Sequence, residues 1–220
     1  MIKLELEINA LKKKLYEMAA LAEDMVNKCI RALREKNMVL AEEVIKGDKK
    51  VNDMEIEIDK HCTKILALYQ PEAEHLRTVL MTMKINNELE RIGDHAVNIA
   101  ERAIYLADKP SVKPLIDIPR MAEQATLMLK ESLDSFVNKD PDLAIEVCKK
   151  DDLVDRLYNQ VIRELMTYMA EDPTTIDRCL ALIMIGKDIE RIADLATNIA
   201  EAAVYVVQGK IIKHHLMDAV

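Results

Sequence analysis

The sequence predicts an all-α protein that is a tandem duplication of two three-helix bundles. Only four glycines and six prolines occur in 220 residues, so turn-forming residues are scarce. The chain also contains an internal repeat, because residues 90–105 recur as residues 190–205 with eleven of the sixteen positions identical. Neither copy contains a proline or a run of β-branched residues. Each copy is therefore expected to lie inside a long helix.

The first half is expected to contain three long helices and one short one. Residues 2–36 show apolar positions at helical spacing without a breaker and predict the first helix. Residues 38–46 predict a short amphipathic helix that Gly47 ends, after which Asp48 caps a second long helix over residues 48–69. Pro71 then breaks the chain and begins a third helix that runs to about residue 108.

The second half repeats the pattern of the first. Residues 40–51 recur at an offset of 103, Pro71 recurs as Pro173, and the offset closes to 100 at Glu190. A proline-rich stretch at residues 109–119 separates the halves, so we place the domains at residues 1–108 and 115–220. A period of about one hundred residues favours a duplicated domain over a solenoid.

Composition and charge exclude several classes of function. The net charge of −8 and the seven aromatic residues argue against nucleic-acid binding, which needs a basic surface. The longest apolar run, residues 179–185, is far shorter than the roughly 20 residues that span a bilayer. Acidic residues near the amino terminus do not fit a signal peptide. We therefore expect a cytoplasmic protein without a membrane span.

The candidate ligands are polar residues outside the apolar stripe of each repeated segment. Glu90, Asp94 and Asn98 follow one another at i, i+4 and i+8, and Glu190, Asp194 and Asn198 repeat this column. Neighbouring carboxylates at this spacing repel each other and cost a helix a few tenths of a kcal/mol. Their presence in both halves indicates that the oxygens have a role as ligands.

A second repeated pair lies on the preceding helix of each half. Asp48 and Asn52 are four residues apart, and Asp151 and Asp155 occupy the corresponding positions. Two such pairs on adjacent helices can converge on one groove, where the oxygens need a positive partner. That partner is either a hard metal ion or a neighbouring Arg or Lys, and Arg91 or Arg191 could serve locally.

Residues 89–94, Leu-Glu-Arg-Ile-Gly-Asp, and residues 189–194, Ile-Glu-Arg-Ile-Ala-Asp, together with the two E(D)-x-x-x-D pairs in each half, resemble the PhoU family. The resemblance covers nearly the whole chain. It implies a cytoplasmic helical regulator of the phosphate-specific transport system that binds multinuclear metal clusters. It also implies one metal site at Asp48, Asn52, Glu90 and Asp94 and another at Asp151, Asp155, Glu190 and Asp194.

Three details concern the implied sites. Asn52 replaces an acid of the family pattern, so the first site carries one negative charge less than the second. Iron is the first candidate by resemblance, and Mg, Mn, Zn or Ca are the other candidate cations. His95 follows Asp94, but Leu195 replaces it in the second half, which argues against a role as a repeated ligand.

The resemblance names the partners and the mode of action. It implies that the protein restrains phosphate uptake and phosphate-starvation signalling through contact with the ATPase subunit of the phosphate ABC transporter and with a phosphate-responsive sensor histidine kinase. A homodimer is also expected. We expect no enzymatic activity and no catalytic residues, because a di-iron carboxylate enzyme needs two Glu-x-x-His motifs and only Glu72 and His75 fit. A metal-independent helical adaptor and an accessory protein of another phosphate transporter remain as alternatives.

Overall fold

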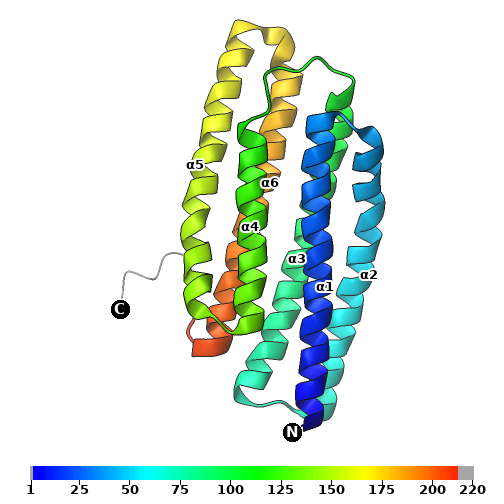
Figure 1. Ribbon diagram of the computed structural model, residues 1–220, viewed down its shortest axis with the longest axis vertical. Coiled ribbons are helices and arrows are strands. Elements are labelled where there is room, and N and C mark those ends of the chain that lie inside the picture. Colours follow the sequence, from blue (N-terminus) through cyan, green and yellow to red (C-terminus); the bar gives the residue numbers. More distant parts are fainter. Residues whose placement is uncertain (1, 213–220) are drawn as a thin grey trace.

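The computed structural model describes residues 2–212 and consists of long helices joined by short connections (Figure 1). The first repeat contains α1 (Ile2–Glu35), α2 (Met38–Tyr69) and α3 (Ala73–Ala107). The second repeat contains α4 (Asp117–Asn138), α5 (Pro141–Glu171), a 3-10 turn η1 (Pro173–Thr175) and α6 (Ile176–Gln208). No strand occurs within this range. The predicted all-α fold with two three-helix repeats is confirmed.

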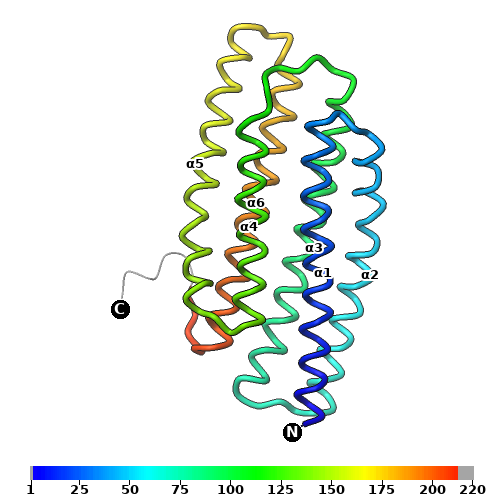
Figure 2. The backbone as a smooth tube through the Cα atoms, viewed as in Figure 1, coloured from blue at the N-terminus to red at the C-terminus, as the bar shows by residue number. Residues whose placement is uncertain are grey.

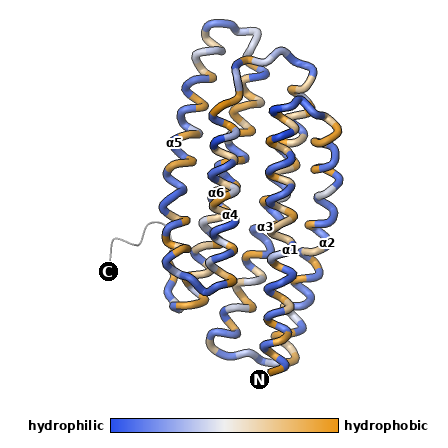
Figure 3. The backbone as a smooth tube through the Cα atoms, viewed as in Figure 1, coloured by the Kyte–Doolittle hydropathy of each residue, from blue (hydrophilic) through white to orange (hydrophobic). Residues whose placement is uncertain are grey.

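The two repeats pack side by side along their length. Within each repeat all three helices contact one another, and between the repeats α1 packs on α4 and α3 packs on α6. Figure 2 shows that α3 and α6 run in opposite directions. Apolar and polar residues alternate along every helix (Figure 3), and the buried apolar residues of both repeats form one continuous core. No helix in the described range has the length and apolarity to span a membrane.

The predicted short helix at residues 38–46 is wrong, because α2 runs without interruption through Gly47 and Asp48. Gly47 does not adopt a positive φ, and Val44 and Val51 on either side of it are 1% and 0% exposed on the core side of α2. The packing of these side chains outweighs the roughly 1 kcal/mol that a glycine costs inside a helix. Asp48 therefore lies within α2 and caps no helix.

The cap of α2 is Asn37, whose side chain accepts a hydrogen bond of 3.1 Å from the backbone N–H of Leu40. The second repeat uses the same device at the start of α5, where Asp140 accepts from the backbone of Asp142 and Leu143 and Pro141 is the first helical residue. The short helix predicted between the first two long helices of each half is thus absent from residues 2–212.

The third helix of each repeat starts just after a proline. Pro71 precedes α3 by two residues and does not itself begin the helix, while Pro173 opens η1 ahead of α6. α3 ends at Ala107, and residues 108–116 connect it to α4 at one end of the bundle (Figure 1). In this arrangement α3 packs on α2, with Gly93 beside Val51, and α6 packs on α5, with Gly186 beside Tyr158.

Candidate functional site

The first acidic cluster forms where α2 packs on α3. The i, i+4 spacing aligns Glu90 and Asp94 along α3, and Asp48 and Asn52 along α2. Gly93 permits a close approach of the two helices, since a Cβ at this position would lie 3.4 Å from Asp48 Oδ1. The predicted pairs on adjacent helices therefore do face one another.

Burial and repulsion between neighbouring carboxylates both disfavour the ionised acids of this cluster. Burial raises the pKa of Glu90, and repulsion from Asp94, Glu55 and Asp48 raises it further. Burial also raises the pKa of Asp48, with Asp94 adding to the rise and a hydrogen bond from Asn52 opposing it. A cation between these side chains would relieve both penalties.

Two oxygens of the cluster are buried without a hydrogen bond. Asn52 Nδ2 donates to Asp48 Oδ2 at 2.8 Å, which leaves Asp48 Oδ1 and Asn52 Oδ1 unpartnered. Buried acceptors without a partner are uncommon, because each one forfeits its hydration. The unpartnered oxygens are of the type that hard metal ions bind.

Glu55 joins the first cluster, although it is not among the ligands that the sequence predicts. It lies on α2 seven residues after Asp48 and is half-buried, and its charge contributes to the raised pKa of Glu90. The signal that could have identified it is the spacing, since i and i+7 share one face of a helix.

The second acidic cluster forms between α5 and α6. Burial raises the pKa of Asp151 to about 7, with further contributions from Asp194, Asp155 and Glu190. Burial and repulsion from Glu190 also raise the pKa values of Asp155 and Asp194. Asp151 Oδ1 is buried without a hydrogen bond, like its counterpart in the first cluster. The four predicted residues of the second site thus form one interacting group.

Cations from the protein itself enter the second cluster. Lys187 Nζ donates to both carboxylate oxygens of Glu190, at 2.7 and 2.8 Å, and Arg191 donates to Asp194 at 2.7 Å. In the first repeat, Arg91 instead donates to Glu88 at 3.1 Å. Local neutralisation by arginine therefore applies to the second cluster more than to the first. The contact of Lys187 with Glu190 could have been predicted from the sequence, because residues three apart lie on the same face of a helix.

Among the described residues, the predicted ligands Asn98 and Asn198 do not take part in the hydrogen bonds of the clusters. Asn98 and Asn198 are half-buried one turn beyond Asp94 and Asp194. Within residues 2–212, neither side chain forms a hydrogen bond to a cluster residue. Their role as oxygen ligands stays a prediction.

His95 points away from the acidic cluster and toward the second repeat. Its Nδ1 lies 2.8 Å from Asp188 Oδ1, and Arg102 donates to Asp188 Oδ2 at 2.7 Å. Asp188 is only 7% exposed, so this group forms a buried polar link between α3 and α6. The contact accounts for His95 without a metal.

The donor chemistry of both clusters fits a metal ion. The candidate ligands are carboxylate and amide oxygens, which suit hard cations, and three of these oxygens are buried without a partner. In the described part of the chain, no group of three His, Cys, Asp or Glu side chains is already arranged around a common point.

The fold and these clusters define a class of protein, namely duplicated three-helix bundles with one acidic cluster between the second and third helix of each repeat. The model of the PhoU domain matches residues 15–103 and 118–203. The chain therefore belongs to the PhoU family, as its two motifs predict.

Named relatives match over almost the entire chain. A phosphate-specific transport system accessory protein PhoU homolog from Aquifex aeolicus is 46% identical over 213 residues, which cover 97% of this chain and 96% of that protein. A homolog with the same description from Pseudomonas aeruginosa is 40% identical over 209 residues, covering 94% and 86% of the two chains.

Solved structures agree with this assignment. The crystal structure of PhoU from Pseudomonas aeruginosa has a TM-score of 0.90 and 39% identity, and the match covers 94% of this chain and 99% of that one. The phosphate transport system regulatory protein PhoU from Streptococcus pneumoniae also has a TM-score of 0.90, at 27% identity, with 96% and 100% of the chains covered. The helical arrangement is thus that of the family.

Proposed function

We propose that this chain is an accessory protein of a phosphate transport system and that it restrains phosphate uptake and phosphate-starvation signalling. The observation that carries the proposal is the family match in both repeats, together with relatives named as accessory proteins of phosphate-specific transport. The chain acts as a cytoplasmic regulator without enzymatic activity, through contact with the ATPase subunit of the phosphate ABC transporter and with a sensor histidine kinase. It functions as a homodimer.

The acidic clusters bind metal cations, with iron as the first candidate. Support comes from the raised pKa values of Asp48, Glu90 and Asp151 and from their unpartnered neighbouring oxygens. Asp48, Asn52, Glu90 and Asp94 hold the first group, and Asp151, Asp155, Glu190 and Asp194 hold the second. A bound cation supplies positive charge that offsets the repulsion across each helix pair.

The metal content of a double variant tests this proposal. Glu90→Ala plus Asp94→Ala is expected to remove the metal of the first site, measured by elemental analysis of protein purified without chelator. The matched control is Asp53→Ala plus Glu57→Ala, an exposed i, i+4 acidic pair on α2 whose partners are surface lysines. If the Glu90→Ala plus Asp94→Ala variant and the unmodified protein had equal metal content, the first cluster would be a charged surface and not a metal site.

A deletion of the gene in its host tests the regulatory role. Phosphate-starvation genes should be expressed in phosphate-rich medium, or uptake should become unrestrained. Immobilised protein should also retain the ATPase subunit and the kinase from purified mixtures, and sedimentation should show a dimer. A deletion strain with normal uptake and normal gene expression would defeat the assignment.

A metal-independent adaptor is the second candidate, and the contacts of the second cluster favour it. Lys187 and Arg191 already supply positive charge to Glu190 and Asp194. The deletion strain carrying a variant that lacks ligands of both sites, Glu90→Ala and Asp94→Ala with Glu190→Ala and Asp194→Ala, distinguishes the two. Full restoration of phosphate control by a metal-free variant supports the adaptor, while failure to restore control by a folded variant supports the metal-dependent regulator.

A further inference from the structure

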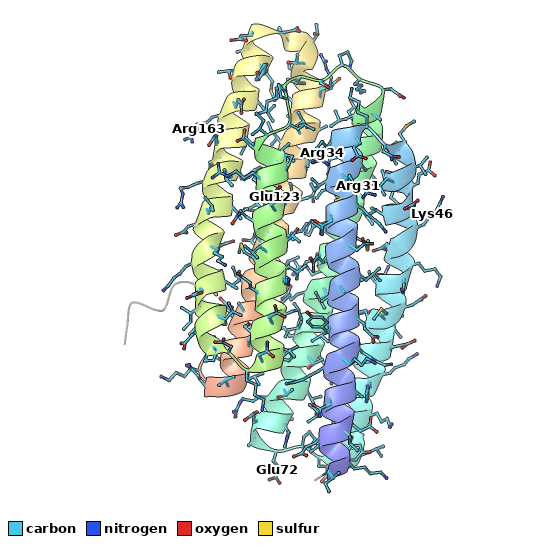
Figure 4. All side chains as sticks on the ribbon, viewed as in Figure 1. Arg31, Arg34, Lys46, Glu72, Glu123 and Arg163 are labelled. Carbon is cyan, nitrogen blue, oxygen red and sulfur yellow. The ribbon has the colours of Figure 1, made fainter. Side chains whose placement is uncertain are left out.

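A pocket lies at the end of the bundle where residues 108–116 connect the repeats. Its lining combines apolar side chains, among them Leu33, Leu106 and Leu182, with basic residues. Lys36 from the end of α1, Lys109 and Lys113 from the connection, and Arg178 from the first turn of α6 line this pocket with Ser111. Figure 4 labels Arg34 at this end of α1, and Glu72 lies at the opposite end of the molecule. Four cations at one place are notable in a chain with a net charge of −8.

One of the four cations is neutralised by acids of the second repeat. Lys113 is buried and forms ion pairs with Asp117, at 3.2 Å, and with Glu164. Its charge therefore belongs to the structure of the connection.

The other three cations contact neutral groups in the described part of the chain. Lys36 Nζ donates to the backbone carbonyl of Lys109 at 2.7 Å, and Lys109 Nζ lies 3.2 Å from the centroid of the Tyr105 ring. Arg178 donates to the carbonyls of Pro110 and Thr174 at 2.9 and 3.2 Å. Within residues 2–212 none of the three forms an ion pair.

These contacts leave most of the donors available. A lysine ammonium has three N–H donors and a guanidinium has five, so Lys36 and Arg178 retain unused donors beside the pocket. Carbonyl dipoles orient the two side chains but do not cancel their charge. Arg178 also helps to lower the pKa of Asp172, after the hydrogen bonds from Thr174, without forming an ion pair with it.

At the corresponding position of the other repeat, the lysine is neutralised by an acid. Lys139 corresponds to Lys36, and both follow a helix end with a left-handed backbone, at φ 58° and 54°. Lys139 forms an ion pair with Glu74, whereas the residue that corresponds to Glu74 in the second repeat, at the offset of 100 that relates α3 to α6, is Thr174. Arg178 replaces a threonine of the first repeat, Thr78. The basic pocket thus arises because one acid is lost and one cation is gained.

We propose that this pocket binds a small oxyanion of the phosphate class, either free inorganic phosphate or the terminal group of a phosphate monoester. The planar guanidinium of Arg178 matches two oxygens of such a group, and the two lysines act as point charges. Ser111, which also lines the pocket, adds a hydroxyl. This site is separate from the acidic clusters and does not depend on their metal.

Titration of chelator-treated protein with inorganic phosphate, sulfate and phenyl phosphate tests the proposal, using amide NMR shifts or calorimetry. We expect a phosphate Kd on the order of 1 mM, with shifts at residues 108–116 and at the start of α6. Phosphate binding without phenyl phosphate binding identifies the free ion, and binding of both identifies a phosphoryl group. Chelation removes any contribution from metal-bound phosphate.

Two variants and a control complete the test. Thr174→Glu restores the acid that the other repeat has, without removing a cation, and should weaken phosphate binding by roughly tenfold or more. Lys36→Ala plus Arg178→Ala should have the same effect and covers the case in which Thr174→Glu does not fold. Lys139→Ala, at the corresponding neutralised position, should change the Kd by less than about twofold.

The proposal is overturned if phosphate does not bind at a concentration about ten times the expected Kd. It is equally overturned if sulfate binds as tightly as phosphate and both variants retain binding. It is also overturned if Lys139→Ala weakens binding as much as Lys36→Ala plus Arg178→Ala, because the effect would then reflect overall charge alone.

Discussion

Replacing Asp151 by Asn should stabilise the metal-free protein. Burial and the neighbouring carboxylates raise the pKa of Asp151 from 3.8 to about 7, so its ionised form is disfavoured in the folded state. A pKa difference of one corresponds to about 1.36 kcal/mol, which sets an upper bound of about 4 kcal/mol. Asp151 is half-buried, and solvent screening reduces the expected gain to about 1–2 kcal/mol. For a chain of this size the melting temperature should rise by about 2–8 °C.

The pH dependence gives the prediction a sign that can be checked. The folded state binds more protons than the unfolded state between pH 3.8 and about 7, so the stability of the unmodified protein falls as the pH rises through this window. The advantage of Asp151→Asn should therefore be absent near pH 3.8 and complete above pH 7. Calorimetry in a chelating buffer at several pH values measures it.

Glu146→Gln, an exposed acid on the same helix, is the matched control and should change the stability by less than about 0.5 kcal/mol. The reasoning fails if Asp151→Asn is neutral or destabilising above pH 7 in protein free of metal. An equal gain at every pH would also refute it, because the effect would then not come from ionisation.

Three further substitutions test the fold and the contact between the repeats. Gly47→Ala should raise the free energy of unfolding by about 1 kcal/mol in a urea titration, because an added Cβ meets nothing within 4 Å inside α2; a loss of stability would indicate that the helix breaks there. Asn37→Ala should lower it by about 1 kcal/mol through loss of the cap of α2, while Asn37→Asp should keep most of it. Asp188→Ala should lower the melting temperature and cost about 3 kcal/mol, because it leaves His95 and Arg102 without their buried partner; an unchanged melting temperature would mean that the link between α3 and α6 contributes little.

The sequence by itself determined the helical class, the duplication and the positions of most candidate ligands. These features depend on spacing along one helix and on comparison of the two halves. Glu90 and Asp94 are recognisable because they are four residues apart, outside the apolar stripe, and repeated as Glu190 and Asp194. The prolines at the boundary between the halves were equally visible, because proline acts on the local backbone.

The continuity of α2 through Gly47 was decided by tertiary packing. A glycine before an aspartate is a strong local signal for a helix end, but the burial of Val44 and Val51 stabilises the helix by more than the glycine costs. Propensity along the chain could not reveal this balance, because the buried area depends on the neighbouring helices.

The electrostatics of the molecule were likewise decided in three dimensions. The sequence contains Lys187, Asp188 and Glu190 within four positions, yet the structure directs Lys187 to the acidic cluster and Asp188 to the other repeat. It also gathers Lys36 and Arg178, which are far apart in the chain, around one pocket. Coulomb energies and desolvation depend on distances between helices and on burial, and neither quantity can be read from spacing within a single helix.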